Sequence, residues 1–267
     1  MTVIVADLGA SNARFAVLQD GKVSDSYQFA CDDFRNPEKM IASFKNNYAP
    51  DATAFVAGVA GVVLGDKVSW TNRKWKISVP QLQKKLGLRT VILKNDVEVQ
   101  CIALPLLKVK DYKILQKVKN PQGTKALLSV GTGLGVGYFI KGMAYAAEYG
   151  QTLTEDGKIL EKMLAHLPAN TTNQKYFAKT DQNCYEFYQN LARIVLNLAL
   201  TLKTTGGIYL YGKMLDEKLF VKSKFIRQFR THPTMSSLLK CVPIYLVKKE
   251  NLAIIGLKEL AKKYGLS

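Results

Sequence analysis

The chain has 267 residues, of which 48% are hydrophobic and 22% are charged, a balance that excludes a disordered or membrane-embedded protein and fits an ordinary globular one. A chain of this length can bury one large core or two modest ones, so its size excludes no globular fold class. Its formal net charge of +17 would attract any polyanion, whether a nucleotide, a nucleic acid or an acidic membrane surface, and does not choose among them.

The N-terminus and the cysteines both favour a reducing cytoplasm. A short apolar run, residues 3–6, follows Met1 with no basic segment before it, which is not the pattern of a signal peptide. The longest apolar runs are too short to span a bilayer, so we expect no membrane span. The cysteines are scattered and predict neither a disulfide framework nor a zinc cluster: Cys31, Cys101, Cys184 and Cys241.

The excess positive charge is mostly lysine, spread along the chain in runs such as residues 108–119 and 213–224. It lacks the clustering of arginine and aromatic residues that is typical of a nucleic-acid platform. We therefore expect solvated basic faces and no nucleic-acid partner.

The first half of the sequence predicts a β-meander followed by helices and further strands. Strands are expected at residues 2–8 and 14–18, separated by a glycine-bearing turn at residues 9–11, and Asp20-Gly21 turns into a third strand. The remaining elements of this half are a helix at 37–47, a strand at 53–57, a hairpin-rich segment up to Thr71, a helix at 80–86 and a strand at 90–93. A proline just inside each helix start fits the fixed φ of that residue.

The second half repeats this plan. A strand at residues 125–130, a glycine turn at 131–135 and a strand at 136–140 open it in the same way. The later elements are helices at 157–165 and 182–204, a strand at 208–210, and a C-terminal helix at 253–263 that is expected to pack on the first lobe. Two such halves predict a duplicated mixed α/β fold with a cleft between the lobes.

A glycine-bearing turn follows the first strand of each half, where backbone N–H groups could bind phosphate oxygens. Asp7 lies beside the first turn, where a carboxylate suits Mg²⁺ on a nucleotide, with Asn12 and Arg14 adding a polar anchor and a positive charge. The alternating glycines of residues 131–135 would let the backbone approach the β- and γ-phosphates. The alternative is that both are simply tight hairpin turns.

The third element is Lys94-Asn95-Asp96, at the end of a predicted strand. A carboxylate there could accept the proton of a hydroxyl that attacks a γ-phosphate, while Asn95 bonds a neighbouring hydroxyl. Taken alone, an Asn-Asp pair before a helix is also typical of an N-cap.

At these residues the chain resembles the bacterial glucokinase family, within the hexokinase, actin and heat-shock ATPase superfamily. The first phosphate motif of that family, Asp-x-Gly-Gly-Thr-Asn-x-Arg, stands here as Asp7-Leu8-Gly9-Ala10-Ser11-Asn12-Ala13-Arg14. The Asn-Asp pair with its catalytic base matches Asn95-Asp96, and the second phosphate motif is identical at residues 131–135. The segment from Gly65-Asp66 through Thr71-Asn72 to Trp75 and the adenosine-site strand at 206–212 are also similar.

Three departures from the family pattern stand out. The sugar-pocket stretch Glu-Gly-Gly-His reads Glu148-Tyr149-Gly150-Gln151, so that the glutamate is kept and the histidine is replaced. A second family glutamate has only Gln174 as a weak counterpart, and Lys213 replaces a glycine of the adenosine motif. The altered pocket implies a weaker hold on the anomeric end of glucose, or a preference for another sugar.

The resemblance implies an α/β protein of two ribonuclease-H-like lobes, the actin/hexokinase fold, with a duplicated mixed sheet and flanking helices. The smaller N-terminal lobe would comprise residues 1–97 and 251–267, and the larger lobe residues 98–250. The implied reaction is phosphoryl transfer from ATP, with Mg²⁺, to a hexose, foremost the 6-hydroxyl of glucose. Asp96 would be the catalytic base, and Asp7 would hold Mg²⁺ through water.

The other implied site residues fall into two groups. The residues that would bind the sugar, with Asp96, are Thr71, Asn72, Asn95, Glu148 and Gln151. The residues that would bind the nucleotide are Asp7, Gly9, Ala10, Ser11, Asn12, Arg14, Gly131, Thr132, Gly133 and Gly212.

Two alternatives stay open. The chain could be a relative that binds nucleotide or sugar with weakened catalysis, or a kinase for an amino sugar or another sugar derivative, for which the contacts of Gln151 would decide. A repressor-type sugar kinase is disfavoured because the sequence has no Cys-x-Cys cluster. By analogy with the family, the chain could also form a homodimer.

Overall fold

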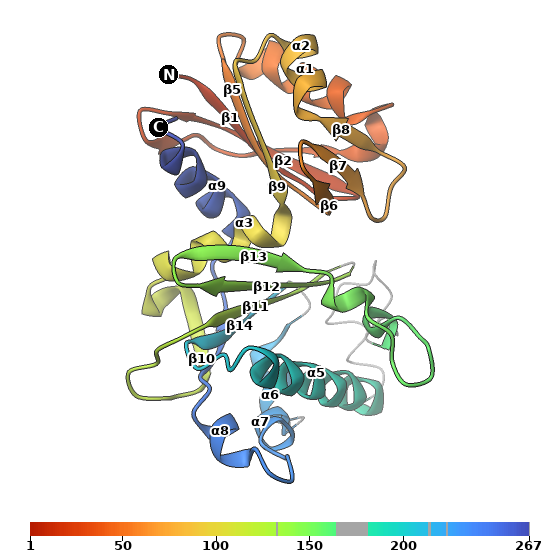
Figure 1. Cartoon of the computed structure of the whole chain (residues 1–267), viewed down its shortest axis with the longest axis vertical. Coiled ribbons are helices and arrows are strands. Elements are labelled where there is room, and N and C mark those ends of the chain that lie inside the picture. The colour runs from red at the N-terminus through yellow and green to blue at the C-terminus, as the bar shows by residue number, and fades with distance from the viewer. Residues whose placement is uncertain (132, 164–180, 213–214, 223, 267) are drawn as a thin grey trace. The chain divides into compact units, whose positions relative to one another are not determined.

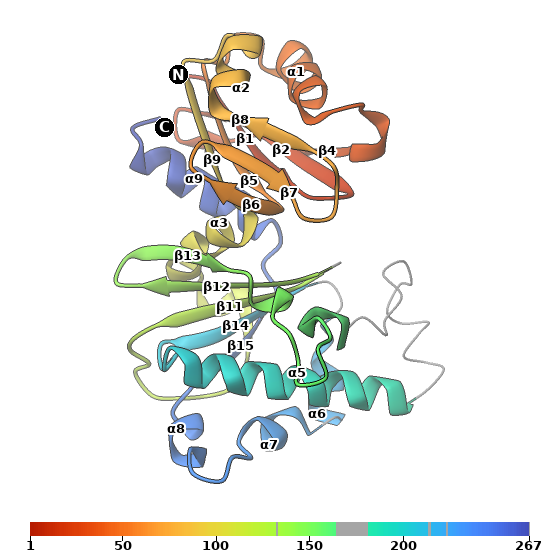
Figure 2. The same cartoon turned by 45° about the vertical axis from the view of Figure 1, so that its right-hand side comes forward.

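The computed structural model describes residues 1–131, 133–163, 181–212, 215–222 and 224–266. The chain groups into two compact units, the first formed by Met1–Pro105 with Glu250–Ser267 and the second by Leu106–Lys249. Each unit has its own mixed sheet with flanking helices, as Figures 1 and 2 show.

The first unit is built on a six-stranded sheet with the order β3-β2-β1-β5-β9, in which β4 also pairs with β2. β1 pairs antiparallel with β2, so the predicted meander is confirmed. The strands predicted at 53–57 and 90–93 are present as β5 and β9, and they run parallel to β1. The strands are β1 (Val3–Leu8), β2 (Asn12–Gln19), β3 (Lys22–Val23), β4 (Tyr27–Ala30), β5 (Ala54–Val59) and β9 (Thr90–Asn95).

A small second sheet in this unit has the order β6-β7-β8 and corresponds to the predicted hairpin-rich segment. Its strands, all antiparallel to their neighbours, are β6 (Gly61–Leu64), β7 (Lys67–Trp70) and β8 (Lys76–Ser78). The loop between β7 and β8 carries the predicted sugar-binding pair Thr71-Asn72.

Helices cover both faces of the main sheet because β1 and β5 alternate apolar side chains that point to opposite sides. α1 (Pro37–Tyr48) and α2 (Val79–Leu86) pack against Ile4 and Phe55, whereas α9 (Leu252–Lys263) packs against Val3 and Val56. Asn36 caps α1, its side chain accepting from the Lys39 N–H, so the boundaries of α1 follow from its sequence.

The C-terminal helix packs on the first unit, as predicted, and it lies unusually close to α3 (Asp96–Ala103). A Cβ built on Gly256 of α9 would lie 1.9 Å from the carbonyl oxygen of Val99 in α3. Only a glycine permits this approach, so Gly256 fixes how α9 supports the helix that begins with Asp96.

The second unit repeats the arrangement in a six-stranded sheet with the order β10-β15-β14-β11-β12-β13. β11, β12 and β13 form the antiparallel meander, and β11, β14 and β15 run parallel. The strands are β10 (Tyr112–Gln116), β11 (Lys125–Val130), β12 (Leu134–Ile140), β13 (Met143–Ala147), β14 (Gly207–Tyr211) and β15 (Ile244–Val247). The duplicated plan inferred from the sequence is therefore present, with β10 added at the edge.

The core of the second unit lies between this sheet and the long helix α5 (Asp181–Thr201). Tyr188, Leu191, Val195 and Leu198 of α5 recur at helical spacing and are fully buried. The shorter helices are α6 (Glu217–Lys222), α7 (Phe225–Phe229) and α8 (Ser236–Lys240). None of the helices in the described ranges is long and apolar enough to cross a membrane.

Two helix predictions need correction. Where a helix was expected at residues 157–165, the described part has a turn at Gly157, with φ of 75°, and a short 3₁₀ helix at Leu160–Met163. The helix predicted at 182–204 ends at Thr201, because Lys203 adopts a left-handed φ of 48°. The other 3₁₀ helices are Cys31–Asp33, Leu104–Leu106, Val109–Asp111 and Tyr149–Gln151.

Candidate active site

The first glycine turn joins β1 to β2 and presents two adjacent amides. The N–H of Gly9 donates to the carbonyl of Asn12 at 3.0 Å, and a Cβ on Gly9 would lie 2.7 Å from that same oxygen, so the turn needs glycine. Within the described ranges, the N–H groups of Ala10 and Ser11 make no hydrogen bond. These two donors are therefore available to an anionic oxygen.

Asp7 and Arg14 face each other across β1 and β2, beside this turn. The Asp7 carboxylate lies 3.9 Å from the Arg14 guanidinium, and 21% of the Asp7 side chain is exposed. Burial raises the pKa of Asp7, and the positive charge of Arg14 partly offsets that rise. Asn12, predicted as a polar anchor, accepts a hydrogen bond from the Gln28 side chain through its Oδ1.

One partly exposed carboxylate suits Mg²⁺ on a nucleotide, because that ion keeps several waters and takes most of its other ligands from phosphates. Asp7 fits this description. In the ranges that the structure describes, no group of three or more His, Cys, Asp or Glu side chains forms a metal cage.

Asn95 and Asp96 lie at the junction of β9 and α3. Asn95 is the N-cap of α3: its Oδ1 accepts from the N–H groups of Val97 and Glu98 at 2.8 and 3.3 Å. Its Nδ2 donates to the carbonyl of Gly61 at 3.0 Å. The cap interpretation of the sequence is confirmed, and this cap places Asp96 in the first turn of the helix.

The register of the first sheet brings the turn and the Asn-Asp pair to one edge. β1, β5 and β9 are parallel, and across β5 the residue Leu8 aligns with Val59 and then with Asn95. Two strand spacings put Asn95 about 10 Å from Leu8, at the carboxyl ends where α/β sheets bind ligands. Gly58 of β5 has no side chain to hold Asp96 away: a Cβ there would lie 3.3 Å from the Asp96 Cα.

The loop between β7 and β8 lines an open pocket of about 620 Å³ formed by residues 69–76. Thr71 and Asn72, the predicted sugar-binding residues of this loop, are both exposed and both line the pocket. The other predicted sugar-binding residues of this unit are Asn95 and Asp96.

The second glycine turn, between β11 and β12, is closed by a hydrogen bond from the Gly131 N–H to the Gly133 carbonyl at 3.0 Å. Thr132, predicted to bind phosphate, lies outside the described residues. The N–H of Leu134 donates to a carboxylate oxygen of Glu161 at 3.1 Å, and a Cβ on Gly133 would lie 2.9 Å from that oxygen. The carboxylate oxygen of Glu161 thus occupies the space that a side chain at position 133 would take.

Glu161 was not among the site residues predicted from the sequence. A carboxylate at this turn repels a phosphate and competes for the Leu134 N–H. Replacing Glu161→Gln removes the charge and keeps an acceptor. We expect ATP to bind about fivefold more tightly, close to 1 kcal/mol, as measured by isothermal titration calorimetry.

The control is Glu155→Gln, which removes the charge of an exposed glutamate of the same segment. Among the described contacts, Glu161 and not Glu155 accepts from the turn. Its affinity for ATP should stay within twofold of the unaltered chain. Weaker binding in the Glu161 variant than in this control would mean that the carboxylate supports the turn instead of competing with phosphate.

The predicted sugar residues of the second unit lie beside this turn. The Gln151 N–H donates to the Glu148 carbonyl at 3.0 Å across a 3₁₀ helix, with Glu148 exposed. A Cβ on Gly150 would lie 2.3 Å from the carbonyl oxygen of Leu134. The backbone of this segment therefore packs directly on the start of β12.

Gly212 follows β14 with a φ of 153°, and a Cβ there would lie 2.0 Å from the carbonyl oxygen of Val130. The end of the predicted adenosine-site strand is thus held against the last residue before the second turn. Gly131, Gly133, Glu148, Gln151 and Gly212 are all brought to this end of the second sheet. Lys213 and Gln174 lie outside the described residues.

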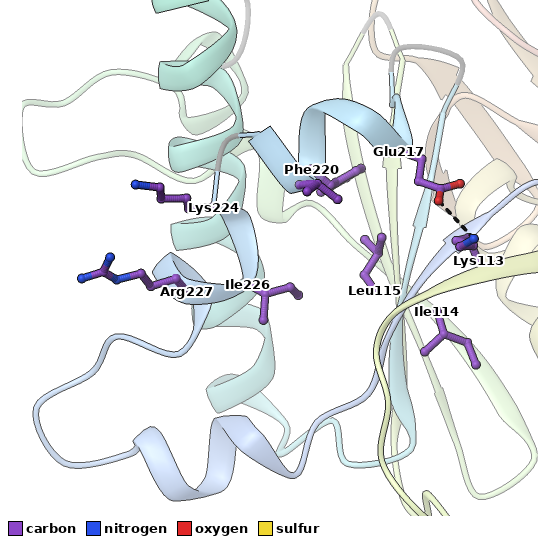
Figure 3. Close-up of a pocket in the computed structure, with 9 residues that line it drawn as sticks. Lys113, Ile114, Leu115, Glu217, Phe220, Lys224, Ile226 and Arg227 are labelled. Atoms are coloured by element: carbon purple, nitrogen blue, oxygen red, sulfur yellow. Dashed lines mark ion pairs between the residues drawn. The ribbon is translucent and has the colours of Figure 1, made fainter.

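A further pocket of about 270 Å³ lies in the second unit between β10 and the helices α6 and α7. Figure 3 shows Lys113 and Glu217, paired at 3.1 Å, at one side, and the charged ends of Lys224 and Arg227 at the other. None of its lining residues belongs to the predicted site, and the pocket was not predicted because β10 and α6 were not anticipated.

The sequence model of one family, described as Glucokinase, matches residues 4–159 and 165–264. The chain belongs to the glucokinase family. The glucokinase of Tolumonas auensis is 27% identical over 305 aligned residues, covering 95% of each protein. That of Neisseria meningitidis serogroup C is 27% identical over 303 residues, covering 95% of this chain and 92% of the relative.

Solved structures agree with this membership. A glucokinase from an Antarctic psychrotroph superimposes with a TM-score of 0.78 at 19% identity, covering 98% of this chain and 99% of that one. A ROK family glucokinase from Streptomyces griseus, solved with glucose and AMPPNP, has a TM-score of 0.68 at 14% identity, covering 98% and 100%. The predicted actin/hexokinase fold class and the family resemblance are both confirmed.

A Listeria monocytogenes protein, provisionally assigned as an N-acetylmannosamine kinase, has a TM-score of 0.73 at 18% identity, covering 99% of this chain and 100% of that one. The fold of the glucokinase family is therefore shared with a protein assigned to an amino-sugar substrate.

Proposed function

We propose that this glucokinase-family chain transfers the γ-phosphoryl group of ATP to the 6-hydroxyl of glucose. The observation that carries the proposal is the pair Asn95-Asp96 at the same sheet edge as the unpaired amides of Ala10 and Ser11. A base and an anion-binding turn are the two parts that such a transfer needs from one lobe. Glucokinases that match over most of their length supply the substrate class.

The compact units Met1–Pro105 with Glu250–Ser267 and Leu106–Lys249 would be the two lobes. The lobes were predicted from the sequence at residues 1–97 with 251–267 and 98–250, so α3 falls wholly in the first unit instead of mostly in the second lobe. The nucleotide phosphates would be bound by backbone amides of both glycine turns, and Gly212 would help to form the adenosine site. Asp7 would hold Mg²⁺ through water, and Mg²⁺ supplies charge neutralisation on the phosphates when it is bound.

Asp96 would accept the proton of the sugar 6-hydroxyl. At the same time the hydroxyl oxygen would form a bond to the γ-phosphorus, and the bond from that phosphorus to ADP would break. The Asn95 cap holds Asp96 in the first turn of α3, which would position the carboxylate before substrate arrives. Asn95, Thr71, Asn72, Glu148 and Gln151 would position the sugar.

Gln151 favours a second candidate substrate, an amino sugar or another sugar derivative. An amide in place of the family histidine changes the donors and acceptors offered to the sugar ring. The likeness to the Listeria protein supports this candidate. A relative with weakened catalysis is the remaining alternative.

A coupled assay of ADP release over a panel of glucose, mannose, glucosamine, N-acetylglucosamine and N-acetylmannosamine tests the proposal. We expect turnover with glucose at a kcat/KM at least tenfold above that of every other sugar. A higher value for an N-acetylated sugar would establish the second candidate. ATP binding without turnover on any sugar would contradict both.

We further propose that the reaction takes place in the cytoplasm and that the protein works without a nucleic-acid partner. Size-exclusion chromatography with light scattering would measure whether the chain forms the homodimer that the family analogy suggests.

A further inference from the structure

We propose that Trp70 is a positioning residue that sets the orientation of the first glycine turn for phosphate binding. The inference rests on the proposed function, because it concerns the nucleotide site of that same reaction. Trp70 lies within the family-like segment of residues 65–75, directly before the predicted sugar-binding pair Thr71-Asn72, and the sequence predicted no role for it.

The indole of Trp70 reaches the turn directly. Trp70 is the last residue of β7 and only 5% exposed, and its Nε1–H donates to the carbonyl oxygen of Gly9 at 3.2 Å. The thiol of Cys31 lies 3.6 Å from the same oxygen. Two donors on this partly buried carbonyl fix the direction in which its oxygen points.

The direction of that carbonyl determines where the next amide points. The Gly9 carbonyl and the Ala10 N–H belong to one planar trans peptide unit and point in opposite directions. Because the Gly9 carbonyl oxygen of this peptide group accepts from Trp70, the Ala10 N–H points away from Trp70. The hydrogen bond therefore orients an amide that has no partner among the described residues.

Trp70 is itself held firmly in place. Its backbone N–H donates to the Trp75 carbonyl at 3.1 Å, and the two indole rings meet edge to face at 5.8 Å between centroids. The Arg73 guanidinium lies 4.4 Å over the Trp75 ring and forms an ion pair with Asp32. The loop that carries Thr71 and Asn72 is thereby braced against the segment that follows β4.

The same backbone connects Trp70 to the proposed base. Trp70 pairs with Gly61 across β6 and β7, and a Cβ on Gly61 would lie 2.8 Å from the Trp70 Cα. The Gly61 carbonyl accepts from Asn95, the residue that caps the helix of Asp96. One strand pair thus contacts both the phosphate turn and the Asn-Asp pair.

The test compares Trp70→Phe, which keeps an aromatic ring and removes the donor, with Trp75→Phe, the matched loss of the other indole. We expect Trp70→Phe to raise the KM for ATP about fivefold with kcat changed less than twofold, the pattern of lost uniform binding. Trp75→Phe should leave both constants within twofold, because the backbone carbonyl at position 75 still accepts from Trp70 and the Phe ring can keep the edge-to-face contact. Circular dichroism and thermal unfolding check that both variants fold.

A second measurement does not depend on activity. The Gly9 N–H closes the turn, so its hydrogen exchange by NMR reports how often the turn opens. Exchange should be at least fivefold faster in Trp70→Phe and unchanged in Trp75→Phe. Equal exchange rates, or an unchanged KM for ATP, would overturn the inference.

If the unaltered chain phosphorylates no sugar, the kinase proposal fails. The role of Trp70 is then decided by the Gly9 exchange rate and by the dissociation constant of ATP, both measured without a sugar present. A Trp70→Phe variant with unaltered exchange and an active parent would instead contradict only the role of Trp70.

Discussion

Replacing Asp96→Asn is expected to lower kcat about a thousandfold. An amide of the same size cannot accept the proton of the sugar hydroxyl, and general-base groups contribute on the order of 10² to 10⁴ in rate. The dissociation constant of ATP should stay within threefold, because the nucleotide is assigned to the glycine turns. Single-turnover kinetics with glucose would measure the loss in the chemical step.

Glu98→Gln is the matched control, since it removes a carboxylate from the same turn of α3. Glu98 pairs with Lys94 at 2.8 Å and is assigned no part in the reaction. Its kcat should remain within threefold of the unaltered chain. Turnover in the Asp96 variant close to that of this control would show that another group acts as base, and the assignment of Asp96 would be wrong.

Replacing Gly212→Ala is expected to raise the KM for ATP at least tenfold, about 1.4 kcal/mol of lost binding. The new Cβ would lie 2.0 Å from the Val130 carbonyl, a contact with backbone that no side-chain rotation can relieve. Either the end of β14 or the second glycine turn must then move. Steady-state kinetics at saturating sugar would measure the change.

Gly142→Ala separates the effect of this contact from the cost of the backbone angle. Gly142 also has a positive φ, 84°, but its hairpin has open space around the missing side chain. This control should lose about 1 kcal/mol of stability and leave the KM for ATP unchanged. A similar rise in KM for both variants would mean that Gly212 has no special relation to the nucleotide site.

The elements that could be predicted from the sequence are strands with alternating apolar and polar residues and elements bounded by glycine or proline. The meanders with their glycine turns, the proline-started helices and the C-terminal helix all follow from such signals. β15 was not anticipated because its four residues are all buried and show no alternation. β10 was missed as well, since it is a five-residue edge strand in which the apolar residues Ile114 and Leu115 are adjacent and break the alternation.

Sequence motifs located the residues of the candidate site, but they did not predict the contacts between residues that are far apart in the chain. The turn at Gly9 and the pair Asn95-Asp96 could be located from residue types. The cap interpretation of Asn95 is confirmed, and the catalytic role of Asp96 stays a prediction. Glu161 meets Leu134 across 27 positions, and Trp70 meets Gly9 across 61. Such pairings arise from the packing of whole strands, so no local pattern in the sequence could have indicated them.

If Asn95 binds the sugar as proposed, the cap on α3 restricts which chemical groups that sugar can present to it. With Oδ1 engaged by two backbone amides and one Nδ2 hydrogen engaged by Gly61, the side chain can offer a ligand only its remaining amide hydrogen. A hydroxyl satisfies this polarity by acting as acceptor, and its own proton is then directed elsewhere. A protonated amine has hydrogens and no lone pair, so it could not accept the remaining Nδ2–H of Asn95. Two donors would then face each other, and binding of an amine at that ring position would be disfavoured.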